Sequence, residues 1–193
     1  MTLAIVILAG GEGKRIGGDK PLRLLGGKRL IDRAAEMARS WSDILAVAVR
    51  DPAQAGETDG SRIIDDPSIE GPLGGLATAL RYARGSECEF LLTIPADMPF
   101  LPADLATRLA AEIAGAGVAI AASGGELHPV CGAWRVGVLG ALPDYLATGR
   151  RSLRGFAEAV GLRAVEWPVE PVDPFFNINS PEDLAAAERM LAD

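Results

Sequence analysis

A basic, glycine-rich stretch near the N-terminus carries the residue types that bind phosphate. It runs from Leu8 to Lys20 and reads LAGGEGKRIGGDK. Glycine allows positive φ angles and lets backbone N–H groups come close to an anion. Arg15 and Lys20 could neutralise a triphosphate and the pyrophosphate that leaves it. We therefore predict phosphate binding here, with an ordinary glycine-rich turn as the alternative.

Two common nucleotide-binding motifs cannot be placed on this stretch. It holds no Gly-x-x-x-x-Gly-Lys-Ser/Thr pattern, so it is not a P-loop. The dinucleotide fingerprint Gly-x-Gly-x-x-Gly also fails, because Ile16 stands where its third glycine should be. The pattern therefore disfavours a nicotinamide-dependent oxidoreductase.

A single aspartate, Asp97, ends an apolar run and is flanked by Pro95 and Pro99. The prolines stiffen the backbone around the carboxylate. Mg²⁺ is commonly held by one or two carboxylates together with substrate phosphates and water. We therefore predict that Asp97 is a magnesium ligand. The alternative is an aspartate in a turn that caps the following helix.

Two adjacent acids, Asp65 and Asp66, follow another short apolar run. Neighbouring residues of a strand point to opposite faces, so at most one of the two should point into a site. The Gly71–Gly75 turn comes next, and its small residues, Gly74 among them, would permit close contact with a flat base. Simple helix-start chemistry explains that turn almost equally well.

Three further groups could contact a substrate. His128 is the only histidine, and a lone histidine is more often structural. Arg150 and Arg151 lie near an expected helix start and could hold a phosphate, although a solvated basic turn is the default. Asn177 and Asn179 would share one side of an extended segment. Their amides could bind a heterocycle or satisfy nearby backbone groups.

Alternating strands and helices must position these residues. Apolar runs predict strands at 3–8, 44–49, 62–64, 90–94 and 118–122. Helical spacing and start signals predict helices at 30–38, 71–83, 102–114, 138–146 and 153–160, and a last helix that begins after Ser180. This order indicates a single α/β domain over residues 1–193, with a doubly wound, mostly parallel sheet and helices on both faces. In such sheets ligands bind beyond the carboxyl ends of the strands, where 9–20, 65–66 and 97 fall.

Bulk composition narrows the function classes. The chain has 193 residues and a net charge of −7, which argues against general nucleic-acid binding. Two cysteines and one histidine are too few for a disulfide framework or a zinc site, so we expect a reducing cytosol. No apolar run reaches the length of a membrane span. Residues 1–8 indicate a buried strand and not a signal peptide.

The motifs together resemble those of the molybdenum cofactor guanylyltransferases. They occur in that family's order across nearly the whole chain: LAGG at 8–11, RIG at 15–17, DK at 19–20, GPLGG at 71–75, PAD at 95–97, HPV at 128–130, GRRS at 149–152 and NINSPEDL at 177–184. The resemblance implies a Rossmann-like nucleotidyltransferase fold. It also implies transfer of GMP from Mg²⁺-bound GTP to molybdopterin carrying molybdenum, with pyrophosphate released.

The resemblance also implies residue roles. Catalytic roles fall on Lys20, Asp97 and Arg15, with Asp97 holding Mg²⁺. Nucleotide contacts fall on Leu8, Ala9, Gly10, Gly11, Lys20, Asp66, Gly74 and Asp97. Acceptor contacts fall on His128, Arg150, Arg151, Asn177 and Asn179. We expect protein contacts, if any, with molybdenum-insertion proteins or molybdoenzyme chaperones, and none with nucleic acid or membrane.

The chain departs from the family pattern at two places. The stretch 46–50 lacks the asparagine that often contacts the nucleotide after the second strand, and Ile16 replaces a usual methionine. Gly10 favours a purine, because the related CMP-transferring enzymes usually have alanine there and a methyl group would narrow the space beside the base. CMP transfer, another NTP-dependent nucleotidyl transfer, and non-catalytic nucleotide binding remain the alternatives.

Overall fold

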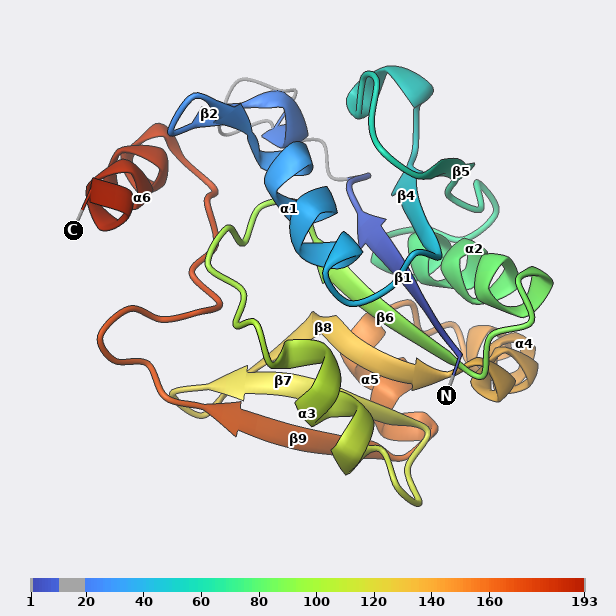
Figure 1. Cartoon of the computed structure of the whole chain (residues 1–193). Coiled ribbons are helices and arrows are strands. Elements are labelled where there is room, and N and C mark those ends of the chain that lie inside the picture. The colour runs from blue at the N-terminus through green and yellow to red at the C-terminus, as the bar shows by residue number, and fades with distance from the viewer. Residues whose placement is uncertain (1, 11–19, 193) are drawn as a thin grey trace.

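One seven-stranded sheet forms the centre of the molecule (Figure 1). The computed structural model describes residues 2–10 and 20–192. The strands in chain order are β1 (Leu3–Leu8), β4 (Leu45–Val49), β5 (Ser61–Ile64), β6 (Phe90–Pro95), β7 (Val118–Ser123), β8 (Glu126–Arg135) and β9 (Leu162–Trp167). Across the sheet their order is β5-β4-β1-β6-β8-β7-β9.

Most neighbouring strands are parallel. The pairs β5/β4, β4/β1, β1/β6 and β7/β9 are parallel, whereas β8 runs antiparallel to both β6 and β7. The carboxyl ends of β5, β4, β1 and β6 therefore lie along one edge of the sheet. The chain moves outward from β1 to β4 and β5, then returns to β6 on the other side of β1. The strand order thus reverses between β1 and β6, where ligands bind in folds of this kind.

Helices cover both faces of this sheet (Figure 1). One face packs against α1 (Leu30–Arg39) and α3 (Leu105–Glu112). The opposite face packs against α2 (Pro72–Gly85), the 3₁₀ segment η4 (Val136–Ala141), α4 (Leu142–Ala147) and α5 (Leu153–Ala159). The predicted single-domain α/β fold with a doubly wound, mostly parallel sheet is confirmed.

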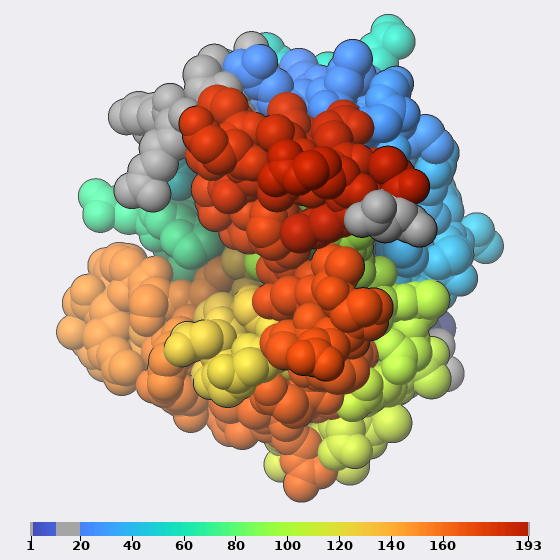
Figure 2. All heavy atoms as spheres, turned by 90° about the vertical axis from the view of Figure 1, so that its left-hand side faces the viewer, coloured from blue at the N-terminus to red at the C-terminus, as the bar shows by residue number. Residues whose placement is uncertain are grey.

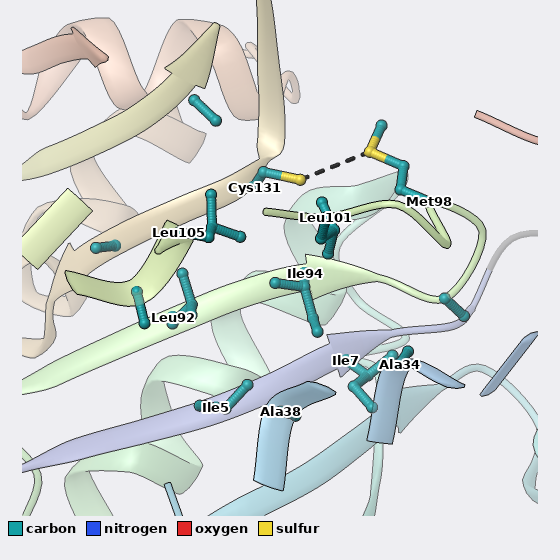
Figure 3. Packing of buried hydrophobic residues seen from close by; sticks show 14 of the residues in the cluster. Ile5, Ile7, Ala34, Ala38, Leu92, Ile94, Met98, Leu101, Leu105 and Cys131 are labelled. Atoms are coloured by element: carbon teal, nitrogen blue, oxygen red, sulfur yellow. Dashed lines mark hydrogen bonds between the residues drawn. The ribbon is translucent and has the colours of Figure 1, made fainter. Parts of the chain in front are cut away.

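Strand β1 shows why the apolar runs form buried strands. Ile5 and Ile7 point to one face and pack beside Ala34 and Ala38 of α1 (Figure 3), while Val6 packs on the other face. Each of these five side chains except Ala34 has no exposed surface. A strand that is covered on both sides must be apolar throughout, so the sequence is continuous instead of alternating.

A C-terminal arm crosses one side of the molecule. After β9, residues 168–180 run without regular structure to α6 (Pro181–Ala192), which packs on the small hairpin of β2 (Leu24–Leu25) and β3 (Lys28–Arg29). Figure 2 shows this arm in orange and red, between the yellow β7–β8 hairpin and the blue N-terminal part. The arm thereby returns to the carboxyl edge of the sheet. Ser180 caps α6 as predicted, because its Oγ accepts from the N–H of Asp183 at 3.1 Å.

The sequence patterns do not predict two strands of the central sheet, β8 and β9. β9 buries only Val165 and Trp167 and carries the charged side chains of Arg163 and Glu166, so it lacks a continuous apolar run. β8 is irregular, since its register with β7 shifts between the pairs Ile120–Gly132 and Ala122–Leu127. That shift places residues 128–131 of β8 opposite one residue of β7. Proline at position 129 and the extra residues conceal the strand from a periodicity argument.

Candidate active site

A cleft of about 280 Å³ opens at the carboxyl ends of the parallel strands. Residues from the ends of β1, β4, β5 and β6 line it, together with the first turn of α2 and the C-terminal arm. Its lining includes Leu8, Ala9, Gly10, Lys20, Arg50, Asp65, Pro72, Gly75, Ala96, Asp97, Met98, Val130 and Asn177. The location is the one that the strand-order reversal predicts.

Lys20 and Asp97 meet in this cleft. Lys20 begins the short 3₁₀ turn η2 (Lys20–Leu22), and Asp97 follows the end of β6. Their side chains form an ion pair between Nζ and Oδ2 and keep only 12% and 20% of their surface exposed. The amine and the carboxylate, 77 positions apart in the sequence, thus converge as predicted.

The C-terminal arm holds Lys20 from the other side. Lys20 Nζ donates to Oδ1 of Asn179 at 2.8 Å and to Oδ1 of Asn177 at 3.4 Å. Both amides therefore lie on one side of the extended segment, as its alternation predicts. Between them, the N–H of Ile178 donates to the carbonyl of Asp97 at 3.0 Å, which fixes the arm against the end of β6.

Only one oxygen of the Asp97 carboxylate contacts Lys20. Oδ2 pairs with Lys20, whereas Oδ1 is buried and has no hydrogen-bond partner among the described residues. Buried polar atoms are normally satisfied, so this oxygen fits a ligand to a cation. Within 2–10 and 20–192, no group of three or more metal-binding side chains occurs. The donor set suits Mg²⁺, which takes few protein ligands and keeps water and phosphate oxygens.

Gly10 and Gly75 enclose the carboxylate of Asp65. A Cβ at Gly10 would lie 2.5 Å from Asp65 Oδ2, and a Cβ at Gly75 would lie 3.2 Å from Oδ1. Burial raises the pKa of Asp65, and the positive charge of Arg50 partly offsets this effect. The absence of a side chain at Gly10 therefore makes room for the carboxylate of Asp65.

Asp66 and Gly74 make contacts within the loop that joins β5 to α2, beside the cleft. Asp66 accepts hydrogen bonds from the N–H and hydroxyl of Ser68 and pairs with Arg81 at 2.7 Å. Those contacts, led by the one to the Ser68 hydroxyl, lower the pKa of Asp66 to about 2. Asp66 lines an adjoining hollow that shares Arg50 and Asp65 with the cleft. A Cβ at Gly74 would lie 2.6 Å from the carbonyl oxygen of Ile69. Of the two acids, Asp65 is the one in the cleft lining.

His128 is fixed in a hydrogen-bonded chain. Ser123 Oγ donates to Asp173 Oδ1 at 2.9 Å and lies 2.8 Å from His128 Nε2, so Nε2 carries a proton toward the serine. The imidazole stacks on Phe175 with ring centroids 4.6 Å apart. Burial lowers the pKa of His128, while Asp173 opposes the effect. These contacts give His128 a structural role in joining the β7–β8 hairpin to the arm, and they leave Nδ1 as an acceptor.

Arg150 and Arg151 lie at the start of α5, as predicted. Arg150 sits over the ring of Tyr145, 5.4 Å from its centroid, and Arg151 donates to the carbonyl of Leu146 at 2.8 Å. Both side chains are exposed. The carbonyl oxygen of Arg151 lies 3.9 Å from the Cβ position of Gly71, so this basic turn borders the adjoining hollow.

Two predicted residues lie outside the described part of the chain. Gly11 and Arg15 belong to 11–19, so their contacts stay predictions. The cleft also contains residues to which the sequence patterns assign no role in binding. Met98 and Val130 line it without charge or amide, and Met98 Sδ lies 3.6 Å from Cys131 Sγ (Figure 3). Only the fold could reveal these apolar walls.

A nucleotide-binding α/β enzyme is the class that this fold and cleft define. Comparison with known proteins narrows it. Residues 5–163 match the family model described as a MobA-like NTP transferase domain. The chain is 42% identical to a molybdenum cofactor guanylyltransferase of Cereibacter sphaeroides, covering 99% of this chain and 98% of that protein. A relative of the same name from Rhodopseudomonas palustris strain HaA2 is 41% identical, covering 95% and 89%.

A solved structure agrees with these relatives. Molybdopterin-guanine dinucleotide biosynthesis protein A from Archaeoglobus fulgidus is 26% identical, with a TM-score of 0.78 over 98% of both chains. The chain therefore belongs to the MobA-like NTP transferase family and is a nucleotidyltransferase. No helix of the described residues is long and apolar enough to cross a membrane.

Proposed function

We propose that this enzyme transfers GMP from GTP to the terminal phosphate of molybdopterin carrying molybdenum. The products are molybdopterin guanine dinucleotide and pyrophosphate. The names of the relatives supply the substrates, and one observation carries the chemistry: Lys20 and Asp97 converge in a cleft at the strand-order reversal. A cation and a carboxylate beside a glycine-lined edge suit a metal-bound triphosphate.

The reaction needs positioning more than it needs a base. An oxygen of the acceptor phosphate attacks the α-phosphorus of GTP in line, a P–O bond forms, and the bond to the β-phosphate oxygen breaks. The attacking phosphate is already anionic near neutral pH, which fits a cleft without a histidine in its described lining. Asn177 and Asn179 hold the Lys20 amine in place. That amine stabilises the negative charge that develops on the pyrophosphate.

Asp97 is the proposed magnesium ligand. Its unpaired Oδ1 could bind the cation while Oδ2 keeps or releases Lys20. Bound Mg²⁺ supplies charge neutralisation and draws phosphate groups together. The remaining ligands would be water and phosphate oxygens.

The acceptor side is proposed at the rim formed by the arm and the basic turn. Asn177 lines the cleft, and Asn179 lies beside it on Lys20. Arg150 and Arg151 expose two positive charges near the adjoining hollow, where a phosphate could bind. His128 presents Nδ1 as an acceptor for a heterocycle N–H.

Pyrophosphate release with purified molybdopterin and each of GTP, CTP, ATP and UTP tests this function. We expect release with GTP and Mg²⁺, and little with the other nucleotides. Preferential release with CTP would reassign the enzyme to CMP transfer. Binding of Mg-GTP without release would instead indicate a non-catalytic nucleotide-binding protein.

We place the reaction in the cytoplasm, where the cysteines Cys88 and Cys131 would stay reduced; both are free and buried. We also propose that the enzyme passes its product to molybdenum-insertion proteins or molybdoenzyme chaperones. Co-purification of tagged enzyme with such a protein would test it.

A further inference from the structure

Asp65 is a second carboxylate of the cleft lining and directly follows β5. Its N–H donates to the carbonyl of Val49 at 2.8 Å and extends the β4–β5 pairing by one residue. The side chain then reaches over the edge of the sheet to the positions of Gly10 and Gly75. Three segments, after β1, after β5 and at the start of α2, thus meet at this carboxylate.

One oxygen of Asp65 is unsatisfied. Oδ1 is buried and has no hydrogen-bond partner among residues 2–10 and 20–192. A buried carboxylate oxygen without a partner is costly and calls for a ligand or another explanation. The last torsion of an aspartate is broad, so a small rotation could bring both oxygens toward the cleft. Asp65 therefore offers two acceptors, side by side, in a part of the cleft that Gly10, Gly75 and the charged residue Arg50 also line.

The position of Asp65 suits the base and not the phosphates. The strands β5, β4, β1 and β6 are neighbours, and adjacent strands lie about 4.8 Å apart. The ends of β5 and β6 are thus separated by roughly 14 Å, and the Asp65 side chain reaches inward from β5 as far as Gly10, which follows β1. A nucleoside triphosphate can extend along this edge, with its phosphates at Lys20 and Asp97. The base then lies at Gly10, Gly75 and Asp65.

We propose that the Asp65 carboxylate recognises guanine by accepting hydrogen bonds from N1–H and the 2-amino group. This inference rests on the proposed use of GTP. The guanine edge presents these two donors side by side, and an ionised carboxylate presents only acceptors. Cytosine and adenine each present one amino donor beside a ring nitrogen that is an acceptor. That ring nitrogen could form no hydrogen bond with the second oxygen of the carboxylate, because both are acceptors. Asp65 would therefore select guanine as well as bind it.

Base analogues test this recognition in the wild-type enzyme. Inosine triphosphate lacks the 2-amino group, so its kcat/KM should be roughly 10-fold or more below that of GTP. Xanthosine triphosphate has a carbonyl in place of that amino group and should be a poor substrate. In Asp65→Asn, one acceptor becomes a donor that matches this carbonyl. We expect kcat/KM for GTP to fall by roughly 10- to 100-fold and kcat/KM for xanthosine triphosphate to rise.

Controls separate this inference from the proposed function. Asp43→Asn, at an exposed loop position, should leave the GTP-to-xanthosine triphosphate ratio at the wild-type value. Unchanged GTP use by Asp65→Asn, or a gain with xanthosine triphosphate in Asp66→Asn instead, would overturn the role of Asp65. If Asp65→Asn does not fold, equal wild-type use of GTP and inosine triphosphate would overturn it. Absence of any GTP turnover by the wild type would instead refute the proposed function.

Discussion

Two carboxylates of the cleft lining, Asp65 and Asp97, each have a buried oxygen without a hydrogen-bond partner among residues 2–10 and 20–192. Lys20 neutralises Asp97, and Arg50 lies close enough to influence the pKa of Asp65. Binding of a metal-bound nucleotide would replace internal partners of Asp97 by metal and water. In this account Lys20 and Asp97 bind the phosphates and the metal, whereas Asp65 contacts the base.

The close approach of Gly10 to Asp65 predicts that substitutions at these two positions are energetically coupled. We expect Gly10→Ala to lower kcat/KM for GTP by roughly 10-fold, because the new methyl group would meet Asp65 Oδ2 at 2.5 Å and displace it. Steady-state kinetics of a double-mutant cycle with Asp65→Ala checks this reason. If the carboxylate transmits the effect, Gly10→Ala should cost much less in the Asp65→Ala background. An equal cost in both backgrounds would mean that the methyl group acts on the base directly.

Much of the site at this scale follows from the sequence. Asp97 and Lys20 stood out because they are charged residues beside apolar or glycine-rich runs. The choice between Asp65 and Asp66 did not follow, because adjacent residues are equivalent until the strand's orientation is known. The contact of Lys20 with Asn177 joins residues 157 positions apart, which no local pattern reveals.

At the scale of elements, the loop from β5 to α2 shapes the base end. Gly71 has a φ of 73°, a conformation that suits glycine, and begins α2 as its N-cap. Asp66 holds the loop through Ser68 and pairs it with Arg81 of α2. The loop and the first turn of α2 thus behave as one unit that places Asp65 and Gly75.

Removal of the Asp66 charge should loosen this unit. Asp66→Asn is expected to lower the free energy of unfolding by about 1 kcal/mol at pH 7, since solvent screens a pair with an exposed arginine. The pKa of Asp66 is lowered to about 2 in the folded state, from 3.8. Its stabilising contribution is therefore complete above the unfolded pKa and lost as the pH falls toward about 2. Urea unfolding at several pH values measures this, and a difference from wild type that grows on acidification would contradict it.

The predictable elements were those with regular patterns. The central strands and the helices around them were found because burial on two faces demands continuous apolar runs. The sequence pattern does not predict β8, because the extra residues at 128–131 break the alternation of the strand. This irregular segment nevertheless brings Val130 to the cleft. Local sequence patterns are least able to predict structure where a strand or helix becomes irregular at a functional site.

Across the whole molecule, the C-terminal arm completes the site. Without Asn177 and Asn179, Lys20 would lose two of its acceptors. The C-terminal part of the arm is anchored twice, by Ile178 on the Asp97 carbonyl and by α6 on the β2–β3 hairpin. Nucleotide binding should therefore stabilise the fold as a unit.

Thermal unfolding tests this coupling. At 100 times its dissociation constant, Mg-GTP should raise the Tm by roughly 5–10 °C, which follows from about 2.7 kcal/mol of binding linkage in a chain of this size. Chelation of Mg²⁺ should remove much of this shift in the wild type. In Asp97→Asn, the shift with GTP should be small and nearly independent of Mg²⁺. A full magnesium-dependent shift in that variant would exclude Asp97 as the metal ligand.

Transfer of an α-phosphate label from GTP to purified molybdopterin tests the central claim most directly. The wild type, Lys28→Ala and Asp43→Asn should all label the acceptor, since Lys28 pairs with Glu36 at the surface and Asp43 is exposed. Lys20→Ala and Asp97→Asn, checked to be folded, should each lower the rate by roughly 100-fold or more. Label transfer at the wild-type rate by either of these two variants would contradict the account.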